Sequence, residues 1–489
     1  MTVFARLARQ SSVYTLGNVL IKLSGLLVVP LLWNTTFLSE VGLANLAVLE
    51  GTAQMAIAFI GSGLTSGMLA LMADPKWREH HEAIPFTTLL ANLGISLTIL
   101  ATFWVISPFF TEYLLSGTSN PLFVRLLGIH VLFKVLGLVP YSWLRGNERV
   151  GWYVAASIAE TAFLIGGAYY FLVEHSMGLE GMMWAYVLSA GVSTLVLSGA
   201  MLARVRWKLH PSIIKELVRY GTPLTLVGLA LPFLHTGDRY LLTLLAPPEE
   251  LAVYSVAARL AGVINTIVVQ GLQLSFAVIG LKVLGESREG VSIHRRTFRH
   301  FAIWAAWPVL GLSLFTYDAT ALLSNNPTYQ LATNLVLPLA LGFYMYGLYN
   351  ITGNVLYAEG RTRAIGFGVL GAAIFNALLN IALIPLMGGL GAALATFVSY
   401  VLLMGFASRL VEHRFQIRFA WAVLLFVLVV VTGLWLLALP SMSWGIVPRV
   451  LWRGFLLLLY PVIVLLTGLY RRDELVRAKA WMQDRYRSL

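Results

Sequence analysis

The chain has 489 residues, of which 58% are hydrophobic and 11% charged, and its mean hydropathy is +0.79. Soluble domains carry about 25% charged residues, so this composition excludes an ordinary soluble protein and is typical of a polytopic membrane protein. Cysteine is absent, which excludes disulfides, thiolate metal sites and a cysteine nucleophile.

About 20 apolar residues are needed to span a bilayer core, and the sequence contains 14 such segments. The first reaches Trp33 without a small-residue cleavage site, so we interpret it as a retained span rather than a signal peptide. The predicted spans are 11–33, 43–66, 85–109, 121–144, 151–173, 181–203, 217–244, 251–275, 300–323, 331–355, 365–386, 388–408, 419–439 and 450–470.

The net charge of +12 is distributed unevenly between the two ends of the spans. Even-numbered gaps are basic, whereas odd-numbered gaps such as NTTFLSEVG, TEYLLSGTSN and SNNPTYQ contain no Lys or Arg, apart from Arg449 beside the last outer loop. Basic loops stay in the cytoplasm, so both termini are expected to be cytoplasmic, in a bacterial or archaeal cytoplasmic (inner) membrane. No separate basic domain exists outside the spans, so nucleic-acid binding is not expected.

An internal repeat is visible at an offset of 210 residues. EVGLANLA from Glu40 matches ELAVYSVA from Glu250, and GMMWAYVLS from Gly181 matches GAALATFVS from Gly391. A repeat of six spans predicts two lobes with the same orientation in the membrane and a site between them near mid-depth. We therefore expect an all-α polytopic membrane protein of two six-helix lobes, in a parallel repeat, plus two C-terminal helices. The expected divisions are 1–205, 206–411 and 412–489.

Charged residues deep in the spans are functional candidates because burying an unpaired charge is costly. Lys22 lies midway along span 1 and either pairs with Glu50 of span 2 or faces a watery cavity as an anion site. Lys134, with His130 one turn away on span 4, lies at a depth comparable to Glu160 of span 5. A structural Lys134–Glu160 pair and a headgroup-binding role for Lys134 are both compatible with this pattern.

Span 7 contains His235, Asp238 and Arg239, and span 8 carries Arg259 at a depth similar to Asp238. Neighbouring helical residues are about 100° apart, so Asp238 and Arg239 cannot share one partner direction. We expect Asp238 to pair with Arg259, and Arg239 with His235 to face the space between the lobes. The reverse assignment, with Arg259 free and Asp238 held by Arg239, stays open. Pro232 and Gly237 predict a bend or hinge here.

The cavity side chains are expected to be mostly cationic, which suits an anion such as a phosphate. Neutral amides on spans 2 and 8 either join helices or contact sugars: Asn45, Gln54, Asn265, Gln270 and Gln273. No catalytic constellation, metal-spaced cluster or nucleotide-binding loop is recognisable, so neither an enzyme nor ATP-driven transport is expected, and no cofactor. Protonation of Glu50, Asp238 or His235, a sodium ion, or the membrane potential could supply the driving force.

Several stretches resemble the polysaccharide flippases of the multidrug/oligosaccharidyl-lipid/polysaccharide exporter superfamily, the Wzx-type proteins of O-antigen, capsule and exopolysaccharide synthesis. The stretches are 14–31, YSWLRGNER (141–149), 220–240 ending in HTGDRY, EELAVYSVAARLA (249–261) and GGLGAALATFVSY (388–400). The resemblance implies a V-shaped, alternating-access fold that moves an undecaprenyl-pyrophosphate-linked oligosaccharide from the cytoplasmic to the outer leaflet. It also implies a cationic cavity in which Lys22, Arg239 and Arg259 hold the headgroup.

The chain departs from this pattern in two places. Many relatives carry an arginine toward the inner end of span 2, where this chain has GLTSGMLALM, and many stop at 12 spans. The extra pair resembles the lipid II flippases, in which added helices border a groove for the prenyl tail. The expected partners are the lipid-linked oligosaccharide, membrane lipids, and the polysaccharide polymerase and chain-length machinery, without nucleotide.

Three alternatives to this function are kept. A lipid II flippase would use the same headgroup chemistry. A cation-coupled drug or metabolite exporter of the same fold would favour an acid-rich cavity, whereas bases outnumber acids in these spans. A membrane-embedded glycosyltransferase, ligase or polymerase generally needs a sizeable outer loop, which the predicted topology does not provide.

Overall fold

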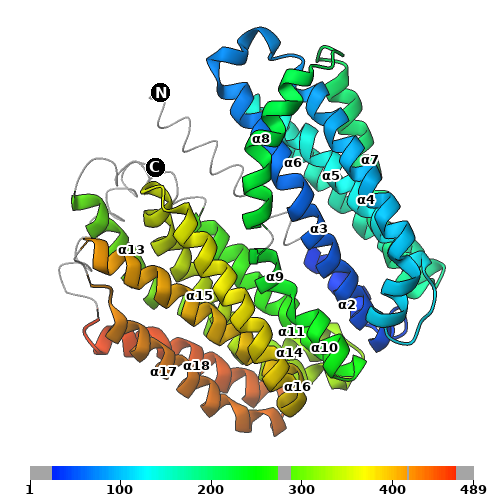
Figure 1. Cartoon of the computed structure of the whole chain (residues 1–489). Helices are drawn as coiled ribbons and strands as arrows, with labels where there is room; N and C mark the ends of the chain where they lie inside the picture. The colour runs from blue at the N-terminus through cyan, green and yellow to red at the C-terminus, as the bar shows by residue number, and fades with distance from the viewer. Residues whose placement is uncertain (1–24, 229, 274–287, 416–417, 470–489) are drawn as a thin grey trace, which may run out of the picture.

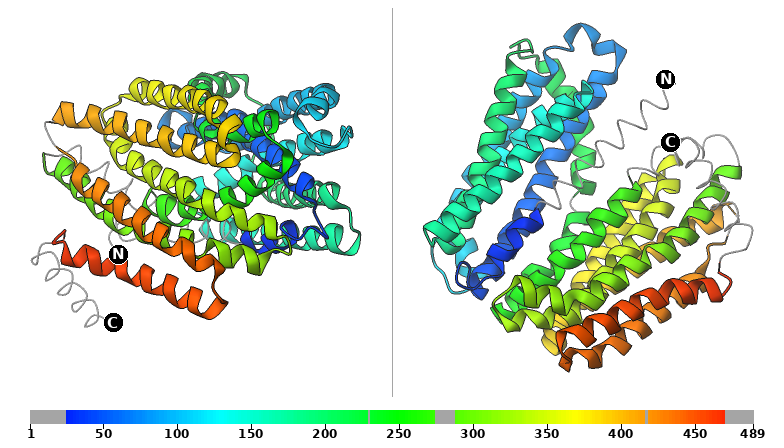
Figure 2. Two further views of the ribbon diagram at one scale, coloured as in Figure 1. Left: turned by 90° about the horizontal axis from the view of Figure 1, so that it is seen from below. Right: turned by 180° about the vertical axis from the view of Figure 1, so that it is seen from behind.

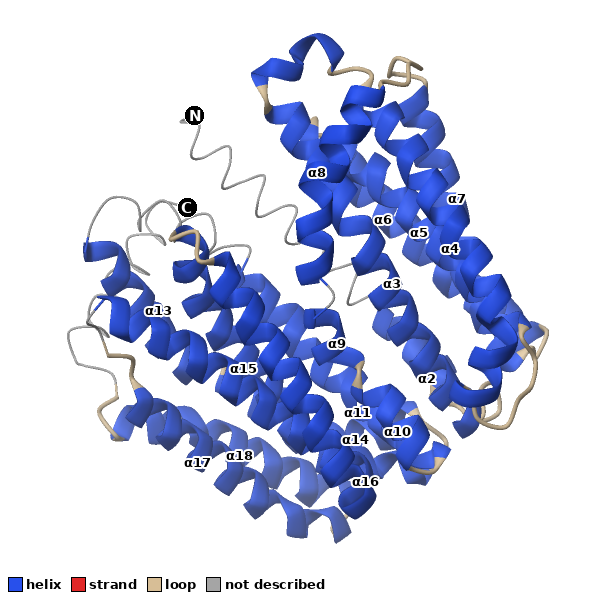
Figure 3. Cartoon of the chain, viewed as in Figure 1, coloured by secondary structure: helices blue, strands red, loops and turns tan. Residues whose placement is uncertain are grey.

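The computed structural model describes residues 25–228, 230–273, 288–415 and 418–469. In these ranges the chain forms helices and loops and contains no strand (Figure 3). The helices are η1 (Gly25–Val28), α2 (Val29–Leu32), α3 (Glu40–Ala73), η2 (Pro75–His80), α4 (Ile84–Leu114), α5 (Leu122–Gly146), α6 (Val150–Ala168), η3 (Tyr169–Glu174), α7 (Gly178–Leu202), α8 (Pro211–Gly228), α9 (Ala230–Thr236), α10 (Asp238–Leu245), α11 (Pro248–Val263), η4 (Ile264–Val269), α13 (Arg288–Trp304), α14 (Ala306–Leu323), η5 (Pro327–Ala332), α15 (Thr333–Ala358), α16 (Thr362–Phe415), α17 (Trp421–Ala438), η6 (Leu439–Ser443) and α18 (Ile446–Leu466).

The helices form two bundles that meet at one end and diverge at the other, in a V (Figures 1 and 2). The first bundle contains α3 to α7, and the second contains α9 to α16. Helices α17 and α18 lie on the outside of the second bundle, against α13 and α14. The expected all-helical, two-lobed membrane fold with an added C-terminal pair is confirmed.

The described residues contain 11 helices that are long and apolar enough to cross a membrane. They account for 12 of the predicted spans, because α16 holds two of them on either side of Gly388, whose φ of 55° breaks the helix. Most of predicted span 1, including Lys22, lies outside the described residues. The remaining span, 217–244, runs from α8 through α9 into α10, and residue 229, between α8 and α9, lies outside the described residues. A total of 14 spans therefore stays a prediction.

Predicted span 7 is divided between the bundles. Helix α8 packs against α3 of the first bundle, whereas α9 and α10 pack against α16 of the second. The backbones of α3 and α8 approach closely at Gly63 and Gly221, where a Cβ on Gly221 would lie 3.0 Å from the carbonyl carbon of Gly63. Larger residues would force these helices apart. The expected division at 205/206 assigns α8 to the second lobe, but its contacts are with the first.

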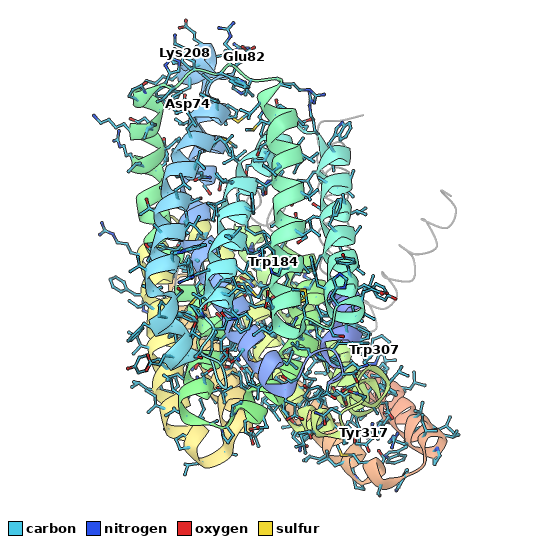
Figure 4. The ribbon with its side chains drawn as sticks, turned by 90° about the vertical axis from the view of Figure 1, so that its right-hand side faces the viewer. Asp74, Glu82, Trp184, Lys208, Trp307 and Tyr317 are labelled. Carbon is cyan, nitrogen blue, oxygen red and sulfur yellow. The ribbon has the colours of Figure 1, made fainter. Side chains whose placement is uncertain are left out.

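The V is closed at the end that carries the odd-numbered loops. There the Thr35 amide donates to Asn325 Oδ1 (2.9 Å), the Ser324 hydroxyl donates to the Trp33 carbonyl (2.7 Å), and Asn326 donates to Glu40. At the opposite end of the first bundle, the basic loops with Asp74, Glu82 and Lys208 stand clear of the second bundle (Figures 1 and 4). The structure is therefore open toward its basic end.

Candidate functional site

The charged residues at the junction of the two bundles come from α3, α10 and α11. The Nη2 atom of Arg259 on α11 lies 2.7 Å from both carboxylate oxygens of Glu50 on α3. Tyr186 of α7 also donates to Glu50. The guanidinium of Arg239 on α10 donates to the Ala47 carbonyl at 3.0 Å and lies 4.0 Å from Glu50. Two arginines of one bundle thus converge on one carboxylate of the other.

The pairing expected for Arg259 is therefore wrong. Its partner is Glu50 across the junction, not Asp238. Asp238 is 2% exposed inside the second bundle, where it accepts hydrogen bonds from Tyr254 and, at 3.3 Å, from Thr396. Position along the helices could not distinguish the two acids, because Glu50 and Asp238 lie at similar depths and helix rotation decides which one faces Arg259.

Arg239 and His235 take different directions, in contrast to the expectation that both face the space between lobes. Arg239 reaches α3 across the space between the bundles. His235 instead contacts Tyr400 of α16 through Nδ1 and lies edge-on to Tyr346 of α15, with ring centroids 5.0 Å apart.

Helix α9 ends at Thr236 and α10 begins at Asp238, but the backbone of Gly237 between them is helical, with φ −65° and ψ −27°, and its amide donates to the Phe233 carbonyl at 2.7 Å. Gly237 therefore does not interrupt the helical backbone, and the bend predicted at Pro232 and Gly237 stays a prediction. A Cβ on Gly237 would lie 2.6 Å from the Phe233 carbonyl oxygen, so a larger residue would disturb the backbone here. The Thr236 hydroxyl donates to the Pro232 carbonyl at 2.9 Å. Whether these residues act as a hinge stays a prediction.

The first bundle contains a second ion pair. Lys134 on α5 pairs with Glu160 on α6, and the Tyr141 hydroxyl donates to the other Glu160 oxygen at 2.9 Å. His130 contacts the Tyr186 carbonyl through Nδ1 at 3.1 Å. The expected contact between spans 4 and 5 is confirmed. A direct role of Lys134 in substrate binding stays a prediction.

Several neighbours of these charges were not anticipated. Tyr186 and Tyr254 each donate to a buried carboxylate, and neither carries a charge that would single it out in the sequence. A third buried cluster joins Asp318 of α14 to Arg449 and Arg453 of α18, at 2.8 and 2.6 Å. The spacing of four residues between these arginines, which places them on one helix face, was the available signal for it.

Two of the polar amides, Asn45 and Asn265, lie in different surroundings. Asn45 holds the turn after α4 through Ser116, donating to its carbonyl and accepting from its amide at 2.8 Å. The side-chain oxygen of Asn265 is buried without a hydrogen-bond partner. In the part of the chain that the structure describes, no three His, Asp or Glu side chains gather as a metal site.

Comparison with known proteins establishes the family. Residues 7–276, more than half of the chain, match the polysaccharide biosynthesis protein family. The chain belongs to this family. No curated protein sequence is significantly similar to this polysaccharide biosynthesis protein.

Solved transporter structures share the fold of this polysaccharide biosynthesis protein. The lipid II flippase MurJ in an inward closed conformation is 14% identical, with a TM-score of 0.70 over 94% of this chain and 99% of that one. An inward-facing multidrug resistance MATE family transporter of the MOP superfamily is 17% identical, with a TM-score of 0.66 over 83% and 94%. A MOP superfamily transporter from Pyrococcus furiosus is 16% identical, with a TM-score of 0.60 over 84% and 96%. The chain is thus a multi-pass membrane protein that shares the fold of these solved structures.

Proposed function

We propose that the protein is a flippase that moves an undecaprenyl-pyrophosphate-linked oligosaccharide from the cytoplasmic to the outer leaflet for polysaccharide biosynthesis. The observation that carries the proposal is the junction of Glu50 with Arg259 and Arg239. Two guanidinium groups of the second bundle face one carboxylate of the first there. Guanidinium groups bind phosphate oxygens through paired hydrogen bonds, so a pyrophosphate suits this site.

In this mechanism Glu50 acts as an internal anion that the substrate displaces. The open end of the V carries the basic loops, which face the cytoplasm under the positive-inside rule, so the headgroup enters from that side. When pyrophosphate takes over Arg259 and Arg239, Glu50 loses its partners and the closed end of the V is released. Rocking of the bundles then exposes the headgroup to the other leaflet, while the prenyl chain stays in lipid.

The lipid II flippase remains the second candidate, and a specific observation favours it. The likeness to MurJ extends over 94% of this chain, including the region of the added C-terminal helices, whereas the likeness to the MATE transporters extends over 83–85%. A cation-coupled exporter fits the junction less well, because a net positive site repels cationic substrates. We place the protein in the cytoplasmic membrane with both termini inside, acting without catalysis and supplying a polysaccharide polymerase.

The test is transbilayer movement in liposomes that contain the purified protein. Fluorescent undecaprenyl-pyrophosphate oligosaccharides and lipid II are each offered as substrate, and protein-free liposomes give the background. Protein-dependent flipping of the oligosaccharide lipids supports the proposal, and flipping of lipid II alone supports the second candidate. Transport of cationic drugs or ions without any flipping would contradict both.

A further inference from the structure

A polar pocket lies inside the first bundle, away from the junction of the two bundles. It has a volume of about 440 Å³ and is lined by side chains of α5, α6 and α7. Such a volume is in the range of pockets that hold small organic ligands. Its hydroxyl groups include those of Tyr141, Ser142, Tyr153, Ser157 and Thr161. The pyrophosphate site does not account for this pocket, because a diphosphate needs cations rather than hydroxyls.

The charges in the pocket are mixed, with Lys134 and Arg145 basic and Glu160 acidic. Lys134 is paired with Glu160, so the Lys134 ammonium already neutralises this carboxylate. Arg145, at the other end of the lining on α5, donates to the Ser142 hydroxyl at 3.0 Å. The rings of Tyr141 and Tyr153 meet edge to face, with centroids 5.2 Å apart, and offer apolar surface beside these polar groups. The lining therefore combines donors, acceptors and aromatic surface.

A second cavity shares part of its lining with this pocket. It has a volume of about 310 Å³ and is lined by Glu50 and Arg259 of the junction. His130, Lys134 and Tyr186 line both cavities. A ligand that reaches from Arg259 into the first bundle has to pass these three side chains.

We propose that the pocket of the first bundle is a sugar subsite, which binds one pyranose unit of the lipid-linked oligosaccharide while its pyrophosphate occupies the Arg259 site. The inference rests on the proposed function and adds where the glycan lies. A sugar offers hydroxyls that both donate and accept, together with apolar C–H faces, which the mixed lining matches. A metal cation would have to displace Lys134, and an acyl chain would place apolar carbons against Lys134, Glu160 and Arg145. A free phosphate can bind Arg145 but makes no use of the apolar surface that the rings of Tyr141 and Tyr153 offer a sugar.

The experiment measures binding of two kinds of lipid to the full-length protein in nanodiscs. One is bare undecaprenyl pyrophosphate, and the other is a panel of undecaprenyl-pyrophosphate-linked saccharides with neutral, amino and acidic hexoses. We expect at least one glycosylated lipid to bind about tenfold more tightly than the bare lipid, because additional hydrogen bonds are made. Ser157→Leu, which fills the pocket, and Tyr141→Phe, which removes one hydroxyl, should reduce that advantage and leave bare-lipid binding unchanged.

Ala159→Leu is the matched control, because it adds the same side chain to α6 at an exposed position that does not line the pocket. It should behave as wild type in both measurements. The subsite would be overturned, while the proposed function stands, if Ser157→Leu and Tyr141→Phe weakened the binding of bare and glycosylated lipid equally. The same conclusion would follow if no glycosylated lipid bound more tightly than the bare lipid. If the wild-type protein binds neither lipid, the proposed function fails and the subsite fails with it.

Discussion

Two buried clusters of arginine and carboxylate have nearly the same composition but different positions. At the junction, Glu50 of one bundle faces Arg259 and Arg239 of the other. In the second cluster, Asp318 binds Arg449 and Arg453, but all three belong to helices on the same side of the V. Arg449 also lies over the ring of Tyr317, 4.7 Å from its centroid. Each cluster carries two positive charges and one negative charge.

The difference in position gives each cluster a different role. Two hydrogen bonds join α18 to α14 and α13 besides the second cluster. Trp307 donates to the Leu457 carbonyl at 3.0 Å, and Tyr460 donates to the Ile303 carbonyl at 2.6 Å. Helix α18 is thereby fixed to α13 and α14 and should move with them. The junction cluster has to open whenever the bundles separate. The same chemistry thus serves as an anchor within one bundle and as an exchangeable contact between two.

The largest effect is expected for Arg259→Ala. Removing a buried guanidinium that binds pyrophosphate should lower flipping by more than about a thousandfold, or about 4 kcal/mol. The measurement is initial flipping rate in liposomes, normalised to inserted protein. Arg449→Ala is the matched control, since it removes an arginine from the anchor, and its rate per folded molecule should stay within a few-fold of wild type. Near wild-type flipping by Arg259→Ala would show that the headgroup does not bind at Arg259.

The anchor is tested by Asp318→Ala. Two arginines then lose their shared counter-charge, so the free energy of unfolding should fall by about 3 kcal/mol. Thermal unfolding in detergent measures this, and flipping per folded molecule should change little. The triple variant Asp318→Leu, Arg449→Met, Arg453→Met removes the whole cluster and should recover most of the stability. A single substitution that lowers flipping without lowering stability would contradict the anchor role.

A smaller effect is expected for Glu50→Gln, which removes the internal anion from the junction. Arg259 is then no longer neutralised, and inorganic pyrophosphate should bind about tenfold more tightly, as measured by titration calorimetry. Glu160→Gln is the control, because that carboxylate is paired with Lys134 inside the first bundle. Unchanged or weaker pyrophosphate binding by Glu50→Gln would show that Glu50 and the substrate do not compete.

The sequence predicts the helical class, the two bundles and most spans, because apolar runs of membrane length are a local property. It also identifies Glu50, Arg239 and Arg259 as intramembrane charges. It could not assign their partners, since these depend on how far α3, α10 and α11 are rotated and shifted against one another. The packing of span 7 shows the same limit: Pro232 and Gly237 indicate a bend, but the contact of α8 with the first bundle depends on close packing at Gly63 and Gly221.

The smallest effect is expected for Asp238→Asn, and this variant distinguishes the two pairings of Arg259. In the structure Asp238 accepts from Tyr254 and Thr396, whereas Arg259 pairs with Glu50. An asparagine side-chain oxygen accepts the same bonds, so stability should fall by about 1 kcal/mol or less and flipping should stay within about threefold of wild type. Tyr254→Phe, which removes the donor, should have a similarly small effect. If Asp238 instead positioned Arg259, Asp238→Asn would lower flipping as severely as Arg259→Ala does. That result would show that the pairing of Arg259 with Glu50 is not the one that functions in transport.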